Sequence, residues 1–321
     1  MVRMWCLSMV LLAPAFATAQ GTAYPSRPVK VIVAYPPGGA TDVAARVLAE
    51  PLSKALGQRV VIENKPGAGG TLGAVFVAKS DADGYTLLFG SAAELSIARV
   101  TMKGVPFDTL RDFQPVSLAG QVPFLLVTPA ALPPNTLPEL IAWIKANPGK
   151  VNYSSFGTNT TNHLAGEAFK AQAGIEATHI PYKGSAPSIA DLMAGQVQYS
   201  FDTITAVLQQ VRGGRLKAIA LAAKQRSALV PNVPTLAEGG LTGFTGGTWF
   251  GLLAPAGTPP AVVEKLHLEM ARILHSEEMR AEYGSRGIDP VGDSPAEFAQ
   301  FIRSEVERWT ALAVKIGLKP E

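Results

Sequence analysis

The stretch VKVIVAYPPGGATDVAARVL, residues 29–48, contains the pattern that decides the predicted fold. Its first five residues form a short apolar run, which is typical of a strand covered on both faces. Two prolines and two glycines then predict a loop. From Thr41 onward the apolar residues fall at helical spacing, so a helix follows the loop. We expect Pro51 to kink or shorten this helix and Gly57 to end it.

The rest of the chain repeats this strand, loop and helix pattern. Further strands are predicted at residues 59–63, 85–89, 122–127, 151–155, 178–181, 197–201, 216–222 and 248–253. Further helices are predicted at residues 71–79, 137–146, 162–173, 187–194, 206–211, 261–275, 276–283 and 295–316. Strands that alternate with helices through short loops favour parallel sheets covered on both faces. Because the pattern restarts at residue 122, we predict an α/β fold of two doubly wound lobes with a ligand cleft between them.

The beginning of the chain predicts an exported protein. An apolar stretch covers residues 4–16, and Ala17-Thr18-Ala19 then offers small residues at the positions that a signal peptidase reads. We therefore predict a signal peptide, residues 1–19, that is cleaved after Ala19. A membrane anchor is the alternative, but the apolar run is too short to span about 30 Å of hydrocarbon, and Pro14 interrupts it.

Composition excludes several classes of protein. The one cysteine, Cys6, lies in the predicted signal peptide, so the mature chain can form neither a disulfide nor a thiolate metal site. The net charge is +3 and no basic run is present, so we expect no nucleic-acid partner. We expect no cofactor. The mature chain, of roughly 300 residues, is long enough for two domains with cores of their own.

The loop at residues 34–42 has the composition of an anion site. It contains neither G-x-G-x-x-G nor G-K-[ST], so it is not a nucleotide-binding fingerprint. Gly38 and Gly39 allow a ligand to approach the backbone, and Thr41 can cap a helix whose first amides have no intrahelical partners. A carboxylate fits such a site as well as a phosphate does, and a plain turn before a capped helix remains the alternative. Asp42 would disfavour a highly charged anion unless its side chain points away.

Later strand ends add polar groups whose ordinary interpretation is structural. The loop at residues 154–163 is rich in hydroxyls and amides, which can bind an anion through hydrogen bonds. Lys183 could supply a cation, although such a side chain is by default solvated. Asp202 by default caps the turn that follows it. His163 and Glu167 are spaced i,i+4, which indicates a paired surface helix rather than a metal site.

Taken together, several segments resemble the Bug or TctC-type proteins, which are periplasmic substrate-binding proteins of tripartite tricarboxylate transporters. The resemblance rests on residues 24–46, 55–74, 83–90, 162–169, 179–197 and 248–259. It covers essentially the whole mature chain in order. The motifs PPGG-x-TD, PGAGG, DGYTLL, PYKG and WFGLLAPAGTP are each weak alone but specific in combination.

The resemblance implies a clamshell of the type II periplasmic-binding-protein class. Lobe 1 would comprise residues 24–120 and 247–321, and lobe 2 residues 121–246, with the chain crossing near 117–124 and 244–253. The protein would be a monomer in the periplasm that captures a small carboxylate. Its partners would be membrane transporter subunits, and a membrane sensor is the alternative partner.

The resemblance also implies which residues bind the ligand. The backbone amides of Gly38, Gly39, Ala40 and Thr41 would hold one carboxylate. The residues that would complete the pocket are Ser91, Ser155, Thr158, Asn159, Lys183, Gly184 and Asp202.

Two positions depart from the pattern that the family usually shows. Residues 158–161 are bulkier than the small residues common there and could narrow the pocket. Glu94 replaces the polar run common after Gly90, and we expect it at the surface, with contact to a ligand ammonium as the alternative.

We predict that the protein is not an enzyme. An exported hydrolase would need a nucleophile and a positioned base. The chain has four histidines and no G-x-S-x-G motif. A Ser155–His163 pair is conceivable, but the sequence offers no obvious third member for it.

Overall fold

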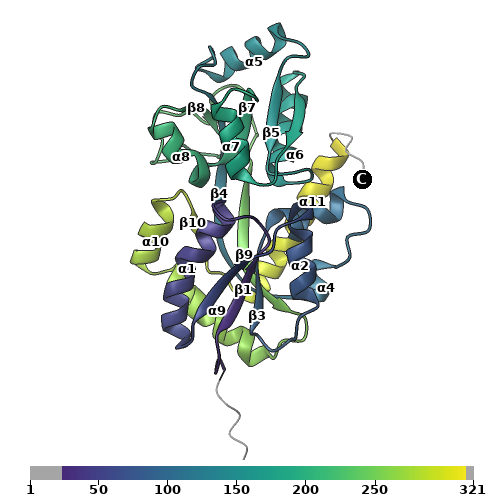
Figure 1. Ribbon diagram of the computed structural model, residues 1–321, viewed down its shortest axis with the longest axis vertical. Helices are drawn as coiled ribbons and strands as arrows, with labels where there is room; N and C mark the ends of the chain where they lie inside the picture. Colours follow the sequence, from purple (N-terminus) through teal and green to yellow (C-terminus); the bar gives the residue numbers. More distant parts are fainter. Residues whose placement is uncertain (1–23, 316–321) are drawn as a thin grey trace, which may run out of the picture.

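The computed structural model describes residues 24–315, and it confirms the predicted α/β fold. The chain builds two sheets that share one long strand, with helices packed around each (Figure 1). The predicted signal peptide, residues 1–19, lies outside the described residues. Among the helices within 24–315, none combines the length and hydropathy needed to cross a bilayer.

The sheet of the first half has a parallel core with antiparallel strands added. Strands β1, β2 and β3 are parallel, with β1 in the centre; β9 pairs antiparallel with β3, and β4 pairs antiparallel with β9. Their bounds are β1 Val29–Val33, β2 Val60–Asn64, β3 Thr86–Ser91, β4 Phe113–Pro129 and β9 Gly247–Pro255. The short β10, Asp289–Pro290, pairs with β4. We call this sheet with its helices the first half.

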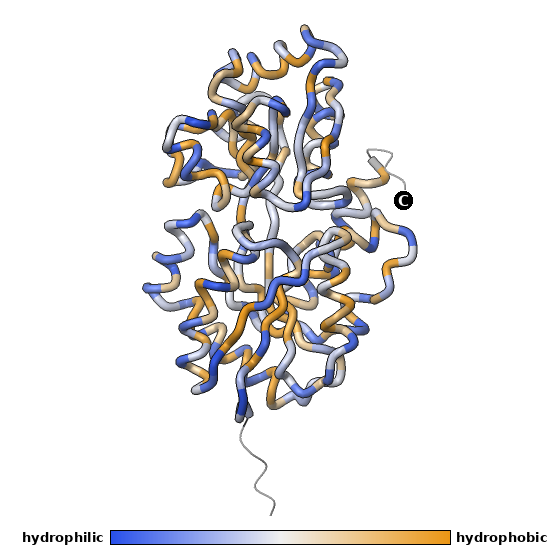
Figure 2. Tube along the Cα trace, in the orientation of Figure 1, coloured by the Kyte–Doolittle hydropathy of each residue, from blue (hydrophilic) through white to orange (hydrophobic). Residues whose placement is uncertain are grey.

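Helices cover both faces of this sheet, because the strands alternate between two apolar cores. Val29, Val31 and Val33 belong to one buried cluster and Ile32 to another. Helices α1 Ala40–Leu56, α9 Pro260–Leu274 and α10 Glu277–Gly284 pack on the first cluster, while α2 Thr71–Ala78 and α11 Pro295–Lys315 pack on the second. Figure 2 shows the central strands as mostly hydrophobic, in keeping with this double cover.

The second half repeats the plan with a smaller sheet. Strands β6, β5 and β7 are parallel, and the end of β4 lies antiparallel between β7 and β8. Their bounds are β5 Asn152–Ser155, β6 Thr178–Pro181, β7 Tyr199–Thr203 and β8 Leu216–Leu221. The helices are α5 Leu137–Ala146, α6 Thr161–Ala173, α7 Ser185–Met193 and α8 Ile204–Arg212.

Strand β4 joins the halves, because it changes partners along its length. It pairs with β9 as far as Pro123, opposite Gly247, and with β7 from Phe124 onward. The chain returns to the first half through Gly246, whose carbonyl accepts a hydrogen bond from Phe124 N–H at 3.0 Å. The lobe bounds 24–120 with 247–321 and 121–246 remain our proposed division of the chain.

The crossing leaves no room for a side chain at Gly247, which gives a stability prediction. A methyl group there would lie 2.3 Å from the Val122 carbonyl oxygen. Gly247→Ala should therefore lower the free energy of unfolding by on the order of 1–3 kcal/mol. Gly284→Ala is the control, since a Cβ at Gly284 meets no described heavy atom within 4 Å. Urea unfolding of both variants tests this, and equal midpoints would show that the crossing is not tightly packed.

The sequence predicted that Pro51 would kink or shorten α1, and the helix is not shortened. It runs through Pro51 to Leu56. Its buried Leu48, Leu52 and Leu56 hold it on the sheet, and this packing outweighs the hydrogen bond that proline removes. Gly57 ends the helix in the left-handed conformation, as predicted.

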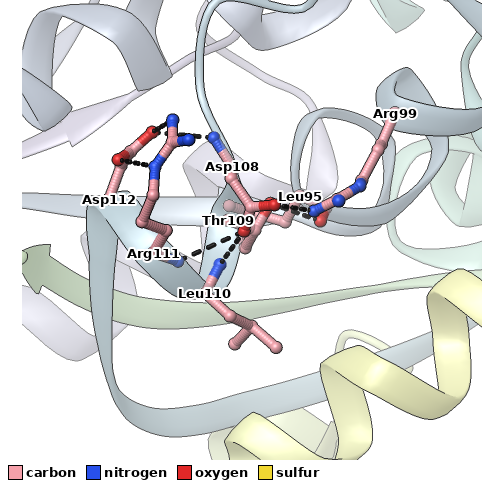
Figure 3. Close-up of polar contacts among 7 residues, drawn as sticks. All are labelled: Leu95, Arg99, Asp108, Thr109, Leu110, Arg111 and Asp112. Atoms are coloured by element: carbon pink, nitrogen blue, oxygen red, sulfur yellow. Dashed lines mark hydrogen bonds and ion pairs between the residues drawn. The ribbon is translucent and has the colours of Figure 1, made fainter.

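The sequence also gave no sign of the short helical turns at residues 93–101 and 109–112. They form η2 Ala93–Ile97, α3 Ala98–Thr101 and α4 Thr109–Asp112. Figure 3 shows how they are joined: Asp108 accepts hydrogen bonds from two amides of α4 and pairs with Arg99. Thr109 Oγ1 donates to the Leu95 carbonyl at 2.7 Å. These contacts fix the segment that follows β3, which carries Glu94.

Candidate functional site

A cavity of about 600 Å³ lies between the two halves, at the carboxyl ends of their strands. It adjoins a second hollow of about 950 Å³, and residues shared by both make one continuous cleft. Those shared residues are Tyr35, Pro36, Phe156, Lys183 and Gly184. The position agrees with the general location of ligands in open α/β sheets.

Four helices begin at the wall of this cavity. The residues at their N-cap positions are Gly39 for α1, Thr160 for α6, Gly184 for α7 and Thr203 for α8, and all four line the cavity. Among the described residues, no side chain caps any of these four helices. The first amides of a helix lack intrahelical acceptors, and the helix dipole is positive at this end. The cavity is therefore built to receive negative charge.

The glycine loop before α1 departs in one respect from its predicted role. Gly38, with φ of 93°, does not line the cavity, and its N–H donates to Asp42 Oδ2 at 3.0 Å. Burial opposes ionisation of Asp42, but hydrogen bonds from Arg46 and Asn64 hold the pKa of its carboxyl below the usual value. Asp42 therefore stabilises the loop by accepting the Gly38 N–H, and it does not line the cavity.

Thr41 does not cap α1, contrary to the sequence prediction. The helix starts at Ala40 with Gly39 as N-cap, so Thr41 already lies within the first turn. Gly39, Ala40 and Thr41 all line the cavity. The part of this loop that faces the cavity therefore consists of residues 39–41.

Ser155, Thr158 and Asn159 lie beside the cavity and not in its wall. Ser155 is fully buried, and its Oγ lies 2.6 Å from His179 Nε2. Asn159 adopts φ of 63°, and its N–H donates to His163 Nδ1 at 3.2 Å. These hydrogen bonds hold the conformation of the loop before α6. Two residues of this loop, Phe156 and Thr160, do line the cavity.

The Ser155–His163 pair considered for a hydrolase does not form. Ser155 Oγ forms a hydrogen bond with His179 Nε2 instead. The imidazole rings of His163 and His179 stack, with their centroids 4.0 Å apart. Burial, followed by the electrostatic interaction with His163, lowers the pKa of His179 to about 4. His163 is buried, which corrects the expectation of a surface position, while its electrostatic interaction with Glu167 is present. No group of three or more potential metal ligands occurs among residues 24–315.

Asp202 lies directly behind the wall of the cavity. It accepts hydrogen bonds from Ser185 Oγ and from Thr203 N–H, each at 2.7 Å, and both donors line the cavity. Burial raises the pKa of the Asp202 carboxyl to about 7. Its default interpretation as a turn cap is correct. Asp202 is not among the residues that line the cavity, so the expected direct contact with a ligand is not supported. Lys183, Gly184 and Ser91 do line the cavity as expected.

Sequence reasoning missed several residues of the wall. They are Tyr35, Phe156, Thr160, Thr161, Ser185, Thr203 and Thr248. Most of them are the first residues of a helix or the last before one, so the strand-to-helix junctions were the signal that could have found them.

Comparison with known proteins decides the family. Residues 44–318 match the family described as the tripartite tricarboxylate transporter family receptor, TctC. The chain belongs to the TctC family. A TctC relative from Bordetella pertussis, protein BugT, is 39% identical over 322 residues, which span 99% of each chain. The resemblance stated from the sequence is therefore confirmed.

Solved structures of TctC-type proteins share this architecture. Rpa4515 of R. palustris with adipate is 34% identical, with a TM-score of 0.91 over 93% of this chain and 100% of that one. MatC of Rhodopseudomonas palustris with bound malate is 34% identical, with a TM-score of 0.85 over 90% and 99%. The periplasmic binding protein BugD is 34% identical, with a TM-score of 0.89 over 93% and 100%. The chain is thus a member of a family of periplasmic solute-binding proteins, not of enzymes.

Proposed function

We propose that this protein captures a small carboxylate between its two halves for a tripartite tricarboxylate-type transporter. The observation that carries the proposal is the meeting of four uncapped helix N-termini in one cavity. One such terminus stabilises an anion by about 0.3–1 kcal/mol, and more where the site is partly buried. Four of them from opposite sides favour a ligand with negative charge at more than one end.

The ligand is, in this proposal, a dicarboxylate of modest length. The amides of Gly39, Ala40 and Thr41 hold one carboxylate, and those at the start of α7 and α6 hold the other. Adipate in Rpa4515 and malate in MatC are both dicarboxylates, which supports this class. Ser91 and Lys183 line the same space and add a hydroxyl and a cation.

Capture proceeds by closure of the two halves. The α1 terminus belongs to the first half and the α6, α7 and α8 termini belong to the second, so a bridging ligand contacts both only in the closed state. A ligand shifts such an equilibrium by its difference in affinity for the two states. The strand crossing at Pro123 and Gly247 is the hinge in this proposal.

The cellular setting follows from the family and from the start of the sequence. We propose export to the periplasm, cleavage after Ala19 and action as a monomer. Delivery to membrane transporter subunits is favoured by the family, and presentation to a membrane sensor is the second candidate. A pull-down from membranes with and without ligand would distinguish the two partners.

A melting assay with a panel of acids tests the proposal. Protein freed of carried-over ligand by unfolding and refolding is mixed with dicarboxylates from malate to adipate, with tricarboxylates and with aromatic acids. A ligand at 100 times its dissociation constant stabilises the folded state by about 2.7 kcal/mol, which gives a clear shift in Tm. The corresponding dimethyl esters are the control and should give no shift. If no acid in the panel raised Tm, the result would contradict the proposed function.

A further inference from the structure

Glu94 is a buried carboxyl group one hydrogen bond behind the cavity. It is 1% exposed, which overturns the expectation of a surface position. It does not line the cavity, but its partners Ser91 and Tyr35 do. Gly70 covers it closely, since a methyl group there would lie 2.9 Å from Glu94 Oε2 and from Tyr35 Oη.

The hydrogen bonds around Glu94 fit a neutral acid better than a carboxylate. Glu94 Oε1 accepts from Ser91 N–H at 2.6 Å. Glu94 Oε2 lies 2.7 Å from Ser91 Oγ and 2.7 Å from Tyr35 Oη, while Tyr35 Oη also lies 3.0 Å from the Gly69 carbonyl oxygen and 3.1 Å from Ser91 Oγ. An ionised Glu94 leaves only the two hydroxyl hydrogens for these four contacts.

A proton on Glu94 supplies the missing hydrogen. Ser91 Oγ then donates to Glu94 Oε2, the acid donates to Tyr35 Oη, and Tyr35 donates to the Gly69 carbonyl. Three of the four contacts are then hydrogen bonds, and only the longest, between Ser91 Oγ and Tyr35 Oη, has no hydrogen. With an ionised acid, two of the four buried oxygen pairs have no hydrogen.

Among residues 24–315, no positively charged side chain forms an ion pair with Glu94, and the exposed Arg303 of α11 bonds Gln300. The segment that carries Glu94, η2, packs against β3, η1, α3 and α11. Strand β3 and η1 contain no charged residue within their bounds. On α3, Arg99 pairs with Asp108, and on α11, Arg308 pairs with the buried Glu305. Lys183 lines the cavity itself, from the opposite half. Burial raises the pKa of the Glu94 carboxyl above its usual range, in keeping with this environment.

We propose that Glu94 holds a proton whenever an organic anion occupies the cavity, so that the ligand anion and this proton are bound together. The inference rests on the proposed function, because it needs an anion next to Ser91. A carboxylate bound there disfavours a second negative charge a few ångströms away and stabilises the neutral acid. The same proton makes this wall suited to an anion and unsuited to a ligand ammonium, so Glu94 acts as a specificity-determining residue.

The pH dependence of binding in Glu94→Gln tests the proposal, because glutamine resembles the neutral acid. The probe is the dicarboxylate that gives the largest shift in the melting panel, titrated calorimetrically from about pH 6 to pH 9.5. Wild-type affinity should fall by about tenfold per pH unit above the pKa that Glu94 has in the ligand-free protein. Glu94→Gln should bind at neutral pH and show a smaller fall, to which Asp202, with a pKa of about 7 behind the same cavity, still contributes. Glu277→Gln, an exposed acid on α10, is the matched control and should behave as wild type.

Two results would overturn the proposal. Equal pH dependence in wild type and Glu94→Gln would show that Glu94 does not take part in proton binding. Loss of binding in a folded Glu94→Gln at every pH would show that the site needs the negative charge.

A measurement without ligand separates this proposal from the proposed function. If Glu94 has a raised pKa, this group binds more protons in the folded protein than in the unfolded chain between about pH 4.3 and its folded-state pKa, so its contribution to stability falls as the pH rises through that window. The Tm of Glu94→Gln relative to wild type should then increase from pH 4 toward alkaline pH, even if no acid in the panel binds. A constant difference would contradict a protonated Glu94.

Discussion

Gly39→Val should weaken binding of the preferred acid by at least about 100-fold, equivalent to roughly 2.7 kcal/mol, while leaving the fold intact. Gly39 adopts φ of −80° and ψ of 167°, which valine tolerates, and a Cβ there meets no described heavy atom within 4 Å. The added methyl groups therefore occupy the cavity and not the core. They keep the carboxylate away from the amides of Ala40 and Thr41, which need direct approach at about 3 Å.

The control for Gly39→Val is the same substitution at Gly284, the last residue of α10, where a Cβ is also unobstructed. Loss of glycine at the N-cap of α1 should cost no more than about 1 kcal/mol of stability. Calorimetric titration gives the dissociation constants, and melting curves report the fold. An unchanged dissociation constant in folded Gly39→Val would remove the loop from the binding site.

Leu164→Ala should weaken ligand binding by about tenfold or more, because it destabilises the closed state without removing any contact to the ligand. Leu164 lies on α6 of the second half, yet it is buried in a cluster with Ile97 of η2 and Trp309 of α11, both from the first half. In Figure 1 the end of α11 reaches up beside α6. Removal of a buried leucine side chain costs about 2–5 kcal/mol, and here much of that cost falls on the contact between the halves.

Leu140→Ala is the matched control for this contact, because Leu140 is equally buried but lies within the core of the second half. It should lower Tm without changing the dissociation constant measured well below Tm. Small-angle X-ray scattering should show a larger radius of gyration for ligand-free Leu164→Ala than for wild type, and a decrease on addition of ligand. Identical affinity in Leu164→Ala and wild type would show that the cluster does not contribute to closure.

The regular elements of this fold were predictable because their residues satisfy local rules. The apolar run Val29–Val33 specifies a buried strand, and Gly57 specifies a helix end because its left-handed conformation suits glycine. Pro51 does not shorten α1, because the packing of α1 on the sheet is a tertiary effect that local propensity does not contain.

The candidate site was only partly predictable, because side-chain direction decides its members. Asp42 could face the ligand or the loop, and its bonds to Gly38, Arg46 and Asn64 are known only from the fold. The burial of Glu94 runs against the general rule that acids lie at the surface, and its hydrogen bonds with Ser91 and Tyr35 make it tolerable.

A crystal structure with the acid that gives the largest melting shift tests the central claim most directly. The account predicts a carboxylate with oxygens about 3 Å from the amide nitrogens of Ala40 and Thr41, and the rest of the ligand directed at the start of α7. An acid bound elsewhere, such as the surface groove lined by Arg46, Lys54 and Arg272, with the cavity between the halves empty, would contradict it.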